Sequence, residues 1–256
     1  MHVVNPDRFP LDAKALYKPY PHTMQDVRSF YETLGIDRMV FVQPSIYGND
    51  NSCMLEALRE VGIRHGRAVV QFDPATIDKD TLQEWHGLGV RGVRVNLVSV
   101  GREVGEEELR NELLQYARII RPLNWVLEIY MPMKLAVVLE KIVPDLGIKV
   151  CIDHFGHPSL PNPYDPVKAL DPYALLGFDS LIRLLKGDTW IKMSGQYRIS
   201  KDPEMRDLDP IARELLKEAP NRVTYATDWP HTSGLAEKLF KTNSEELWDV
   251  PADNTE

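Results

Sequence analysis

Residues Tyr225-Ala226-Thr227-Asp228-Trp229-Pro230-His231 end a short apolar run with a carboxylate, a stiff Trp-Pro turn and an imidazole. Earlier in the chain, Val150-Cys151-Ile152-Asp153-His154-Phe155-Gly156-His157 repeats the pattern, with Asp153 and His154 placed where an apolar run stops. In parallel barrels, chemistry sits at the carboxyl ends of the strands. Two strand ends of this kind therefore predict one shared active-site mouth.

Apolar runs of strand length alternate with helix-like segments, the pattern of βα units around a parallel sheet. The predicted strands are His2–Val4, Arg38–Gln43, Arg67–Phe72, Val90–Asn96, Trp125–Tyr130, Lys149–His154, Trp190–Ser194 and Arg222–Thr227. The predicted helices are Thr23–Leu34, Ser52–Val61, Asp80–Leu88, Glu106–Arg121, Lys134–Val143, Tyr173–Leu185 and Pro210–Glu218. No linker or repeat interrupts the series, so we predict one α/β domain over residues 1–256, a distorted (β/α)8 TIM barrel. The proline-rich stretch from Gly156 to Pro172 is predicted to be a loop over the mouth.

Composition excludes several classes of function. The 38 acidic and 30 basic residues give a net charge of −8, which opposes binding to nucleic acid. No apolar run approaches the roughly 20 residues that span a bilayer, so we predict no membrane segment. Cys53 and Cys151 lack metal or redox spacing, and no signal peptide is apparent, which favours a cytoplasmic protein. No nucleotide-binding glycine motif is present, and the sequence indicates no oligomeric state.

Alternation of side chains places polar residues inside the predicted barrel. In the last strand Val223 and Tyr225 are expected to face the helices, so Asp228 points inward. In Val90–Leu97 the apolar residues face outward and leave Arg94 in the interior. The same alternation assigns to the inner face, near strand ends, Gln43, Ser45, Gln71, Asp73, Asn96, Glu128, Tyr130, His154, Lys192 and Ser194.

Asp228 and His154 are the leading catalytic candidates. An ionised Asp228 within hydrogen-bond reach of water would be a general base. An Asp after a strand also commonly caps a helix or anchors a loop. His154 would polarise a carbonyl or bind a metal, although a lone histidine at a strand end often makes only structural hydrogen bonds. The two residues together favour an active site more than either does alone.

Substrate-binding candidates surround this pair. Arg94 is suited to a substrate carboxylate because a guanidinium offers a fork of donors and a permanent charge. Arg198 is a second candidate, with a solvated loop cation as its alternative reading. Ser45 lies on the predicted inner face, while Tyr47 and Tyr130 would add hydroxyl donors, as would Tyr197. His157 and His231 lie near the mouth and would support it.

A metal hydrolase of this architecture would have a His-x-His pair on the first strand and further ligands on the fifth, sixth and eighth. The chain supplies His2, His154 and Asp228, but its fifth strand has Glu128 and Tyr130 and no histidine. We therefore predict no cofactor. Zinc held by His2, His154 and Asp228 is the alternative.

Five segments in this order resemble the amidohydrolase superfamily, in the branch similar to 2-pyrone-4,6-dicarboxylate lactonase. They are Met1–Pro6, Val90–Asn96, Ile152–Gly156, Lys192–Gly195 and Ala226–His231. The resemblance implies a distorted (β/α)8 barrel in which Asp228 activates water while His2 and His154 polarise the lactone carbonyl. It also implies that Arg94 and Arg198 hold substrate carboxylates.

The chain departs from the family pattern at both ends. The family's first strand reads Asp-x-His-x-His, whereas Met1 here occupies the position between the histidines, so one histidine is missing. The chain closes with the polar residues Val250–Glu256 where family members continue through further helices. We expect a truncated first strand, a shortened C-terminal helical layer and, through the truncation, impaired activity.

These features together predict a hydrolase that opens a lactone or related cyclic ester of a small carboxylated substrate with Asp-activated water. Two alternatives stay open. One is a zinc-dependent decarboxylase of the same superfamily. The other is a catalytically impaired barrel that acts as a binding protein.

Overall fold

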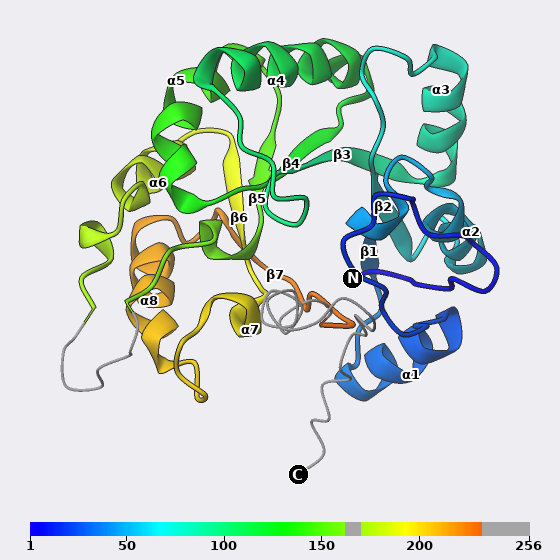
Figure 1. The fold of residues 1–256 in the computed structure, drawn as a ribbon, viewed down its shortest axis with the longest axis horizontal. Coiled ribbons are helices and arrows are strands. Elements are labelled where there is room, and N and C mark those ends of the chain that lie inside the picture. Colours follow the sequence, from blue (N-terminus) through cyan, green and yellow to red (C-terminus); the bar gives the residue numbers. More distant parts are fainter. Residues whose placement is uncertain (162–169, 232–256) are drawn as a thin grey trace. The chain divides into compact units, whose positions relative to one another are not determined.

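The computed structural model describes residues 1–161 and 170–231. Within them, seven parallel strands alternate with helices, and their order in the sheet follows the chain from β1 to β7 (Figure 1). This is the strand order of a (β/α)8 barrel, so the predicted fold class is confirmed. The chain divides into a first compact unit, Met1–Arg94 with the chain from Asp228, and a second unit, Val95–Thr227. A single domain over the whole chain stays a prediction.

The bounds of the elements agree closely with the sequence pattern. The strands are β1 (Met39–Val42), β2 (Gly66–Val70), β3 (Val90–Asn96), β4 (Val126–Tyr130), β5 (Val150–Ile152), β6 (Thr189–Met193) and β7 (Val223–Tyr225). The helices are α1 (Met24–Leu34), α2 (Ser52–Val61), α3 (Lys79–Leu88), α4 (Glu106–Ile120), α5 (Ala136–Leu146), α6 (Phe178–Leu185), α7 (Gln196–Ile199) and α8 (Asp209–Glu218). The short α7 was not predicted. No described helix is both long and apolar enough to cross a membrane.

The predicted first strand, His2–Val4, is not a strand of the described sheet. Val4 instead forms an isolated antiparallel bridge with His22. Met1 still lies along β1, because its amino group donates to Val40 O at 3.1 Å and its carbonyl accepts from Val42 N at 2.9 Å. A single residue bonded to β1 in this way is too short a run to form a ladder.

The first unit is built from β1, β2, the beginning of β3 and the helices α1, α2 and α3. Helix α1 begins at Thr23, whose backbone N–H donates to the Asp26 carboxylate at 2.7 Å, and ends at Gly35 in a left-handed conformation. β1 and β2 pair in parallel from Met39 opposite Gly66. Fully buried Phe41 and Val70 belong to the core of this unit.

The second unit contains β4, β5, β6 and β7, which pair in parallel in that order. One face of these strands is apolar and completely buried, with Ile129, Ile152 and Ile191 aligned across three strands. Successive residues of a strand point to opposite faces of the sheet. Glu128 and Lys192, the sequence neighbours of Ile129 and Ile191, therefore point to the other face. This alternation places Glu128 and Lys192 together, as predicted.

One part of the parity argument is wrong within the described residues. Tyr225 was expected to pack outward against a helix, but it is 72% exposed. The expected C-terminal helical layer lies beyond residue 231, outside the described residues, and so does the middle of the loop predicted between Gly156 and Pro172.

Gly177 offers a test of packing in the second unit. Its φ is +97°, and a Cβ placed there would lie 2.1 Å from the backbone oxygen of Met133. Because both the strain and the overlap oppose a side chain, Gly177→Ala should lower the free energy of unfolding by about 2 kcal/mol or more in urea titrations. Gly187→Ala is the control, since its Cβ would meet only Leu184 O at an ordinary 3.5 Å. Equal midpoints for the two variants would contradict this packing.

Candidate active site

Asp228 and His2 form a buried pair in the first unit. Asp228 follows the end of β7 by three residues and has a left-handed backbone, with φ of 55°. Its carboxylate Oδ1 lies 3.5 Å from Nε2 of His2. Only 5% of Asp228 and 7% of His2 are exposed, so both are shielded from bulk water. The sequence prediction that these residues share a site is thus consistent with their placement.

The protonation of His2 follows from its second ring nitrogen. Nδ1 lies 2.8 Å from the backbone oxygen of Val42, which can only accept a hydrogen bond, so Nδ1 carries the proton. Burial lowers the pKa of His2 despite the opposing contact with Asp228, which favours a neutral ring. Nε2 is then a lone-pair acceptor. Two acceptors facing each other in this way are suited to binding the two O–H groups of one water molecule.

Backbone and aromatic contacts hold this pair in place. The N–H of His2 donates to Trp229 O at 2.8 Å. The Trp229 ring stacks on Phe30, with centroids 5.4 Å apart, and meets His22 edge-on at the same distance. The segment after Asp228 is therefore anchored both to the chain start and to α1.

Arg94, the predicted carboxylate ligand, is buried in the same unit with 4% of its surface exposed. Its guanidinium donates to Gln43 O at 3.3 Å. The Gln43 amide donates to Gly48 O at 3.1 Å and Asp50 O at 2.8 Å, which fixes this support. The positive charge of Arg94 adds to the lowering of the His2 pKa, of which burial is the main cause.

Ser45 and Tyr47 lie in the short 3-10 turn after β1. The Tyr47 hydroxyl accepts a hydrogen bond from Asn5 N at 2.9 Å, and the residue is 2% exposed. Burial raises the pKa of Tyr47, so its hydroxyl stays protonated. These contacts anchor the N-terminal segment. Ser45 is half-buried, and substrate contacts by either residue stay predictions.

His154 belongs to the second unit, where three neighbouring residues fix the position of its ring. Its Nδ1 lies 2.9 Å from Ser194 Oγ, and its ring meets Tyr130 edge-on with centroids 4.7 Å apart. Gly195 has φ of +64°, and a Cβ there would lie 2.6 Å from His154 Nδ1. We call Tyr130, Ser194 and Gly195 the His154 cradle. Only glycine fits the third position of this cradle.

His157 extends the site toward two cations. The Tyr130 hydroxyl lies 3.3 Å from His157 Nδ1. Burial, followed by the charges of Arg198 and Lys201, lowers the pKa of His157 to about 4. Arg198 lies over the Tyr197 ring at 5.0 Å. Arg198 was predicted as a carboxylate ligand. Lys201, which is exposed in the structure, was not singled out from the sequence.

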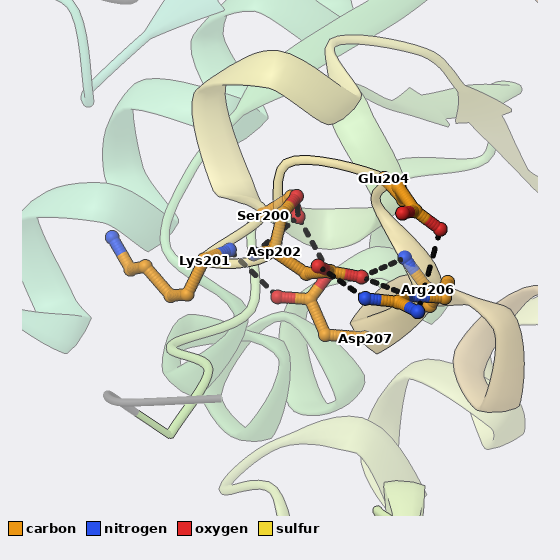
Figure 2. Close-up of polar contacts among 6 residues, drawn as sticks. All are labelled: Ser200, Lys201, Asp202, Glu204, Arg206 and Asp207. Atoms are coloured by element: carbon orange, nitrogen blue, oxygen red, sulfur yellow. Dashed lines mark hydrogen bonds and ion pairs between the residues drawn. The ribbon is translucent and has the colours of Figure 1, made fainter. Parts of the chain in front are cut away.

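A network of short polar contacts fixes the loop that follows α7 and carries Lys201 (Figure 2). The Asp207 carboxylate accepts from the Ser200 hydroxyl and from Lys201 N, each at 2.6 Å. Asp202 accepts from Arg206 Nε at 2.7 Å, and this contact lowers the pKa of Asp202 to about 2. The Lys201 side chain extends away from the network in Figure 2, which leaves its amine outside these contacts.

A buried ion cluster made of Glu128, Asp153 and Lys192 was not anticipated as a unit. Lys192 Nζ lies 2.5 Å from Glu128 Oε2 and 2.9 Å from Asp153 Oδ1. Although burial lowers the pKa of Lys192, the charges of Asp153 and Glu128 outweigh it and raise the pKa overall. Removing one partner of a buried pair typically costs about 3–5 kcal/mol. Parity placed Glu128 and Lys192 on one face, and their opposite charges were the available signal.

A zinc site needs three or four protein ligands around one ion. In the part of the chain that the structure describes, no three or more His, Cys, Asp or Glu side chains are grouped so that they could hold a metal ion. His2 has the Nδ1-to-carbonyl contact that often orients a metal ligand, but with Asp228 it makes only two ligands. We derive no step through a metal.

A pocket of about 380 Å³ lies in the first unit, between the N-terminal segment, α1 and α2. Two ion pairs line it, Arg8 with Glu56 and Arg28 with Glu60. None of the predicted site residues lines this pocket. Of the predicted site residues, His2, Asp228 and Arg94 lie in the first unit. His154, Tyr130 and Arg198 lie in the second unit. The convergence of His154 and Asp228 stays a prediction.

Comparison with known proteins places these residues in context. A family model described as amidohydrolase matches residues 1–250. The chain is 31% identical to 4-sulfomuconolactone hydrolase of Hydrogenophaga intermedia, over 90% of this chain and 73% of that protein. It is 30% identical to 2-pyrone-4,6-dicarboxylate hydrolase of Comamonas testosteroni, over 90% of this chain and 75% of that protein. A solved structure from Acinetobacter baumannii, described as a probable 2-pyrone-4,6-dicarboxylic acid hydrolase with citric acid bound, has a TM-score of 0.74 and 28% identity, and the match covers 94% of this chain and 88% of that one.

The lowered pKa of His157 predicts a pH dependence of stability. Between the ordinary pKa of 6.5 and the folded value of about 4, the unfolded chain binds more protons, so stability falls as pH falls through this window. The loss from His157 is expected to reach at most about 3 kcal/mol. Urea unfolding at pH 7 and pH 4.5 should show a smaller pH-dependent loss for His157→Gln than for the wild type. His65→Gln, at the surface of the first unit, is the control, and identical losses in all three proteins would refute the assignment.

Proposed function

Because the chain belongs to the amidohydrolase family, we propose that it is a hydrolase that opens a lactone or related cyclic ester of a small carboxylated molecule. The observation that carries this proposal is the pair of Asp228 and His2. A buried carboxylate oxygen and an unprotonated imidazole nitrogen, 3.5 Å apart, are suited to hold and deprotonate a water molecule.

In this mechanism Asp228 is the general base. The water donates one hydrogen bond to Asp228 and the other to Nε2 of His2, and its oxygen attacks the lactone carbonyl as Asp228 takes the proton. The tetrahedral intermediate then collapses with cleavage of the ring C–O bond, and Asp228 passes its proton to the leaving oxygen, which restores the carboxylate. The sequence resemblance assigned His2 to the carbonyl oxygen. The contact of Nδ1 with Val42 O instead leaves Nε2 without a hydrogen to donate, so we assign His2 to the water.

His154 is the proposed donor to the developing oxyanion. If the Ser194 hydroxyl donates to Nδ1, Nε2 of His154 carries the proton and can donate it as a hydrogen bond to the carbonyl oxygen. The proposal that both histidines act on one lactone comes from the sequence. His154 follows β5 by two residues and Asp228 follows β7 by three, and catalytic groups of parallel barrels come from positions just after the strands.

The substrate class is supported by the charged groups and by the relatives. Arg94 in the first unit, and Arg198 in the second, are suited to carboxylates. Both curated relatives named above act, by their names, on lactone-type rings bearing acidic groups, and the Acinetobacter structure contains citrate, a small polycarboxylate. We propose a small molecule with at least one carboxylate, and no nucleic acid, as the partner.

Cofactor and location complete the proposal. No step above needs a resident metal. Elemental analysis separates this from zinc-dependent decarboxylation, which would require about one zinc per chain and loss of activity on chelation. Cys53 and Cys151 are free thiols, which is consistent with the reducing cytoplasm that we propose as the location.

Asp228→Asn tests the general base. The amide keeps the shape of the side chain but cannot take a proton, so kcat for carboxylated lactones should fall by about 100- to 10,000-fold. The rate is measured from ring opening in steady state. Asp188→Asn, a change of an exposed carboxylate in the second unit, should leave it unchanged. A wild-type rate in Asp228→Asn would remove the proposal.

Gly195→Ala tests the cradle. The new Cβ would press on the His154 ring, so kcat should fall by roughly 100-fold, the typical cost of a misplaced catalytic group. Gly101→Ala is the matched control, because Gly101 has a similar φ of +60° but nothing within 4 Å of its Cβ. Gly101→Ala carries only the backbone strain and should keep the wild-type kcat, whereas Gly195→Ala adds the overlap with His154 and should lose activity as well as more stability in urea titrations. Equal activity would show that the ring position is unimportant.

A further inference from the structure

The ion cluster lies directly before the His154 cradle along three neighbouring strands. Glu128 on β4 precedes Tyr130 by two residues, and Lys192 on β6 precedes Ser194 by two. Asp153, at the end of β5, immediately precedes His154 itself. Each charged residue therefore lies one or two positions before a residue of the site. Glu128 and Lys192 precede Tyr130 and Ser194, which contact the His154 ring, and Asp153 precedes His154.

Lys192 is the centre of this arrangement. Its amine contacts Glu128 at 2.5 Å and Asp153 at 2.9 Å, and so links β6 to both β5 and β4. The side chains of Glu128 and Asp153 are 3% and 2% exposed and that of Lys192 is 15% exposed, so water screens these contacts only weakly. The paired residues end at Ile129 with Ile152 and at Ile152 with Ile191, so His154 and Ser194 lie beyond them. The two ion pairs join the three strands at this point.

The cradle needs such a constraint. Ser194 Oγ must stay within hydrogen-bond distance of His154 Nδ1, and the Tyr130 ring must stay edge-on to the imidazole. His154 has φ of 50°, a conformation that most residues avoid and that its surroundings must maintain. Displacement of any of the three strand ends would change these contacts together.

We propose that Lys192 is a positioning residue for His154: by holding Glu128 and Asp153, it fixes the spacing of the three strand ends that carry the His154 cradle. Lys192 itself touches no reacting atom. The inference rests on the proposed catalytic role of His154 and assigns a function to a buried charge that the hydrolytic mechanism leaves unused. The contrasting view is that Lys192 only stabilises the sheet.

Two variants separate these views. Lys192→Met keeps the length of the side chain and removes its charge. The double variant Lys192→Met with Glu128→Gln also removes one carboxylate, and the new amide can donate to Asp153, so it avoids two unpaired buried charges if the single variant fails to fold. Lys186→Met is the matched control. It removes a lysine of the same unit whose amine contacts Glu218 O at 2.6 Å, away from the cradle residues.

The first measurement is steady-state hydrolysis of 2-pyrone-4,6-dicarboxylate by the full chain. We expect kcat to fall by about 100-fold in the folded Lys192 variants, with KM within about threefold of the wild type, because the histidine is displaced and not removed. Lys186→Met should keep both values. A purely structural role would lower the unfolding midpoint without moving kcat.

The second measurement needs no substrate. The imidazole ¹H–¹⁵N signals of His154 are assigned by their loss in His154→Gln, and are expected to move in the Lys192 variants but not in Lys186→Met. Wild-type ring signals and wild-type kcat in a folded Lys192 variant would overturn the proposal. If the wild type opens no lactone, the proposed function fails, and the ring signals alone still decide whether Lys192 positions His154. Signals that move while kcat holds would support positioning and count against catalysis by His154.

Discussion

The contact of the largely buried Lys192 ammonium with two buried carboxylates is the constraint on which the second unit depends. Charges inside a protein are costly unless each is paired at short range, and Lys192 forms ion pairs with both Glu128 and Asp153 within 2.9 Å. Since the three residues come from consecutive strands, their ion pairs also fix the positions of the strand ends. The positions of the groups that contact His154 depend on these strand ends.

In the first unit, backbone hydrogen bonds of Met1 and His2 hold an imidazole in place. Met1 and His2 make backbone hydrogen bonds to β1 on one side and to Trp229 on the other. The same contacts set the tautomer of His2, because a backbone carbonyl occupies Nδ1. A segment too short to form a strand thus still determines how an imidazole faces Asp228.

The proposed mechanism rests on protonation states that the surroundings favour. Burial keeps His2 and His157 neutral, whereas the carboxylates around Lys192 keep it charged. A neutral His2 beside a carboxylate is chemically different from an imidazolium beside one, since it accepts hydrogen bonds at the nitrogen that faces Asp228. This difference moved our assignment of His2 from the carbonyl oxygen to the water.

The sequence by itself determined the alternation of strands and helices, the family resemblance and the face on which Asp228, Arg94 and Lys192 lie. These follow from local periodicity and short motifs, which need no knowledge of distant residues. Only the tertiary structure decided the partners. Lys192 and Glu128 are 64 residues apart, and His2 and Val42 are 40 apart, so their contacts depend on strand pairing that no local pattern encodes. The left-handed backbone at His154 and Asp228 is likewise maintained by surrounding contacts, because isolated residues of these types seldom adopt it.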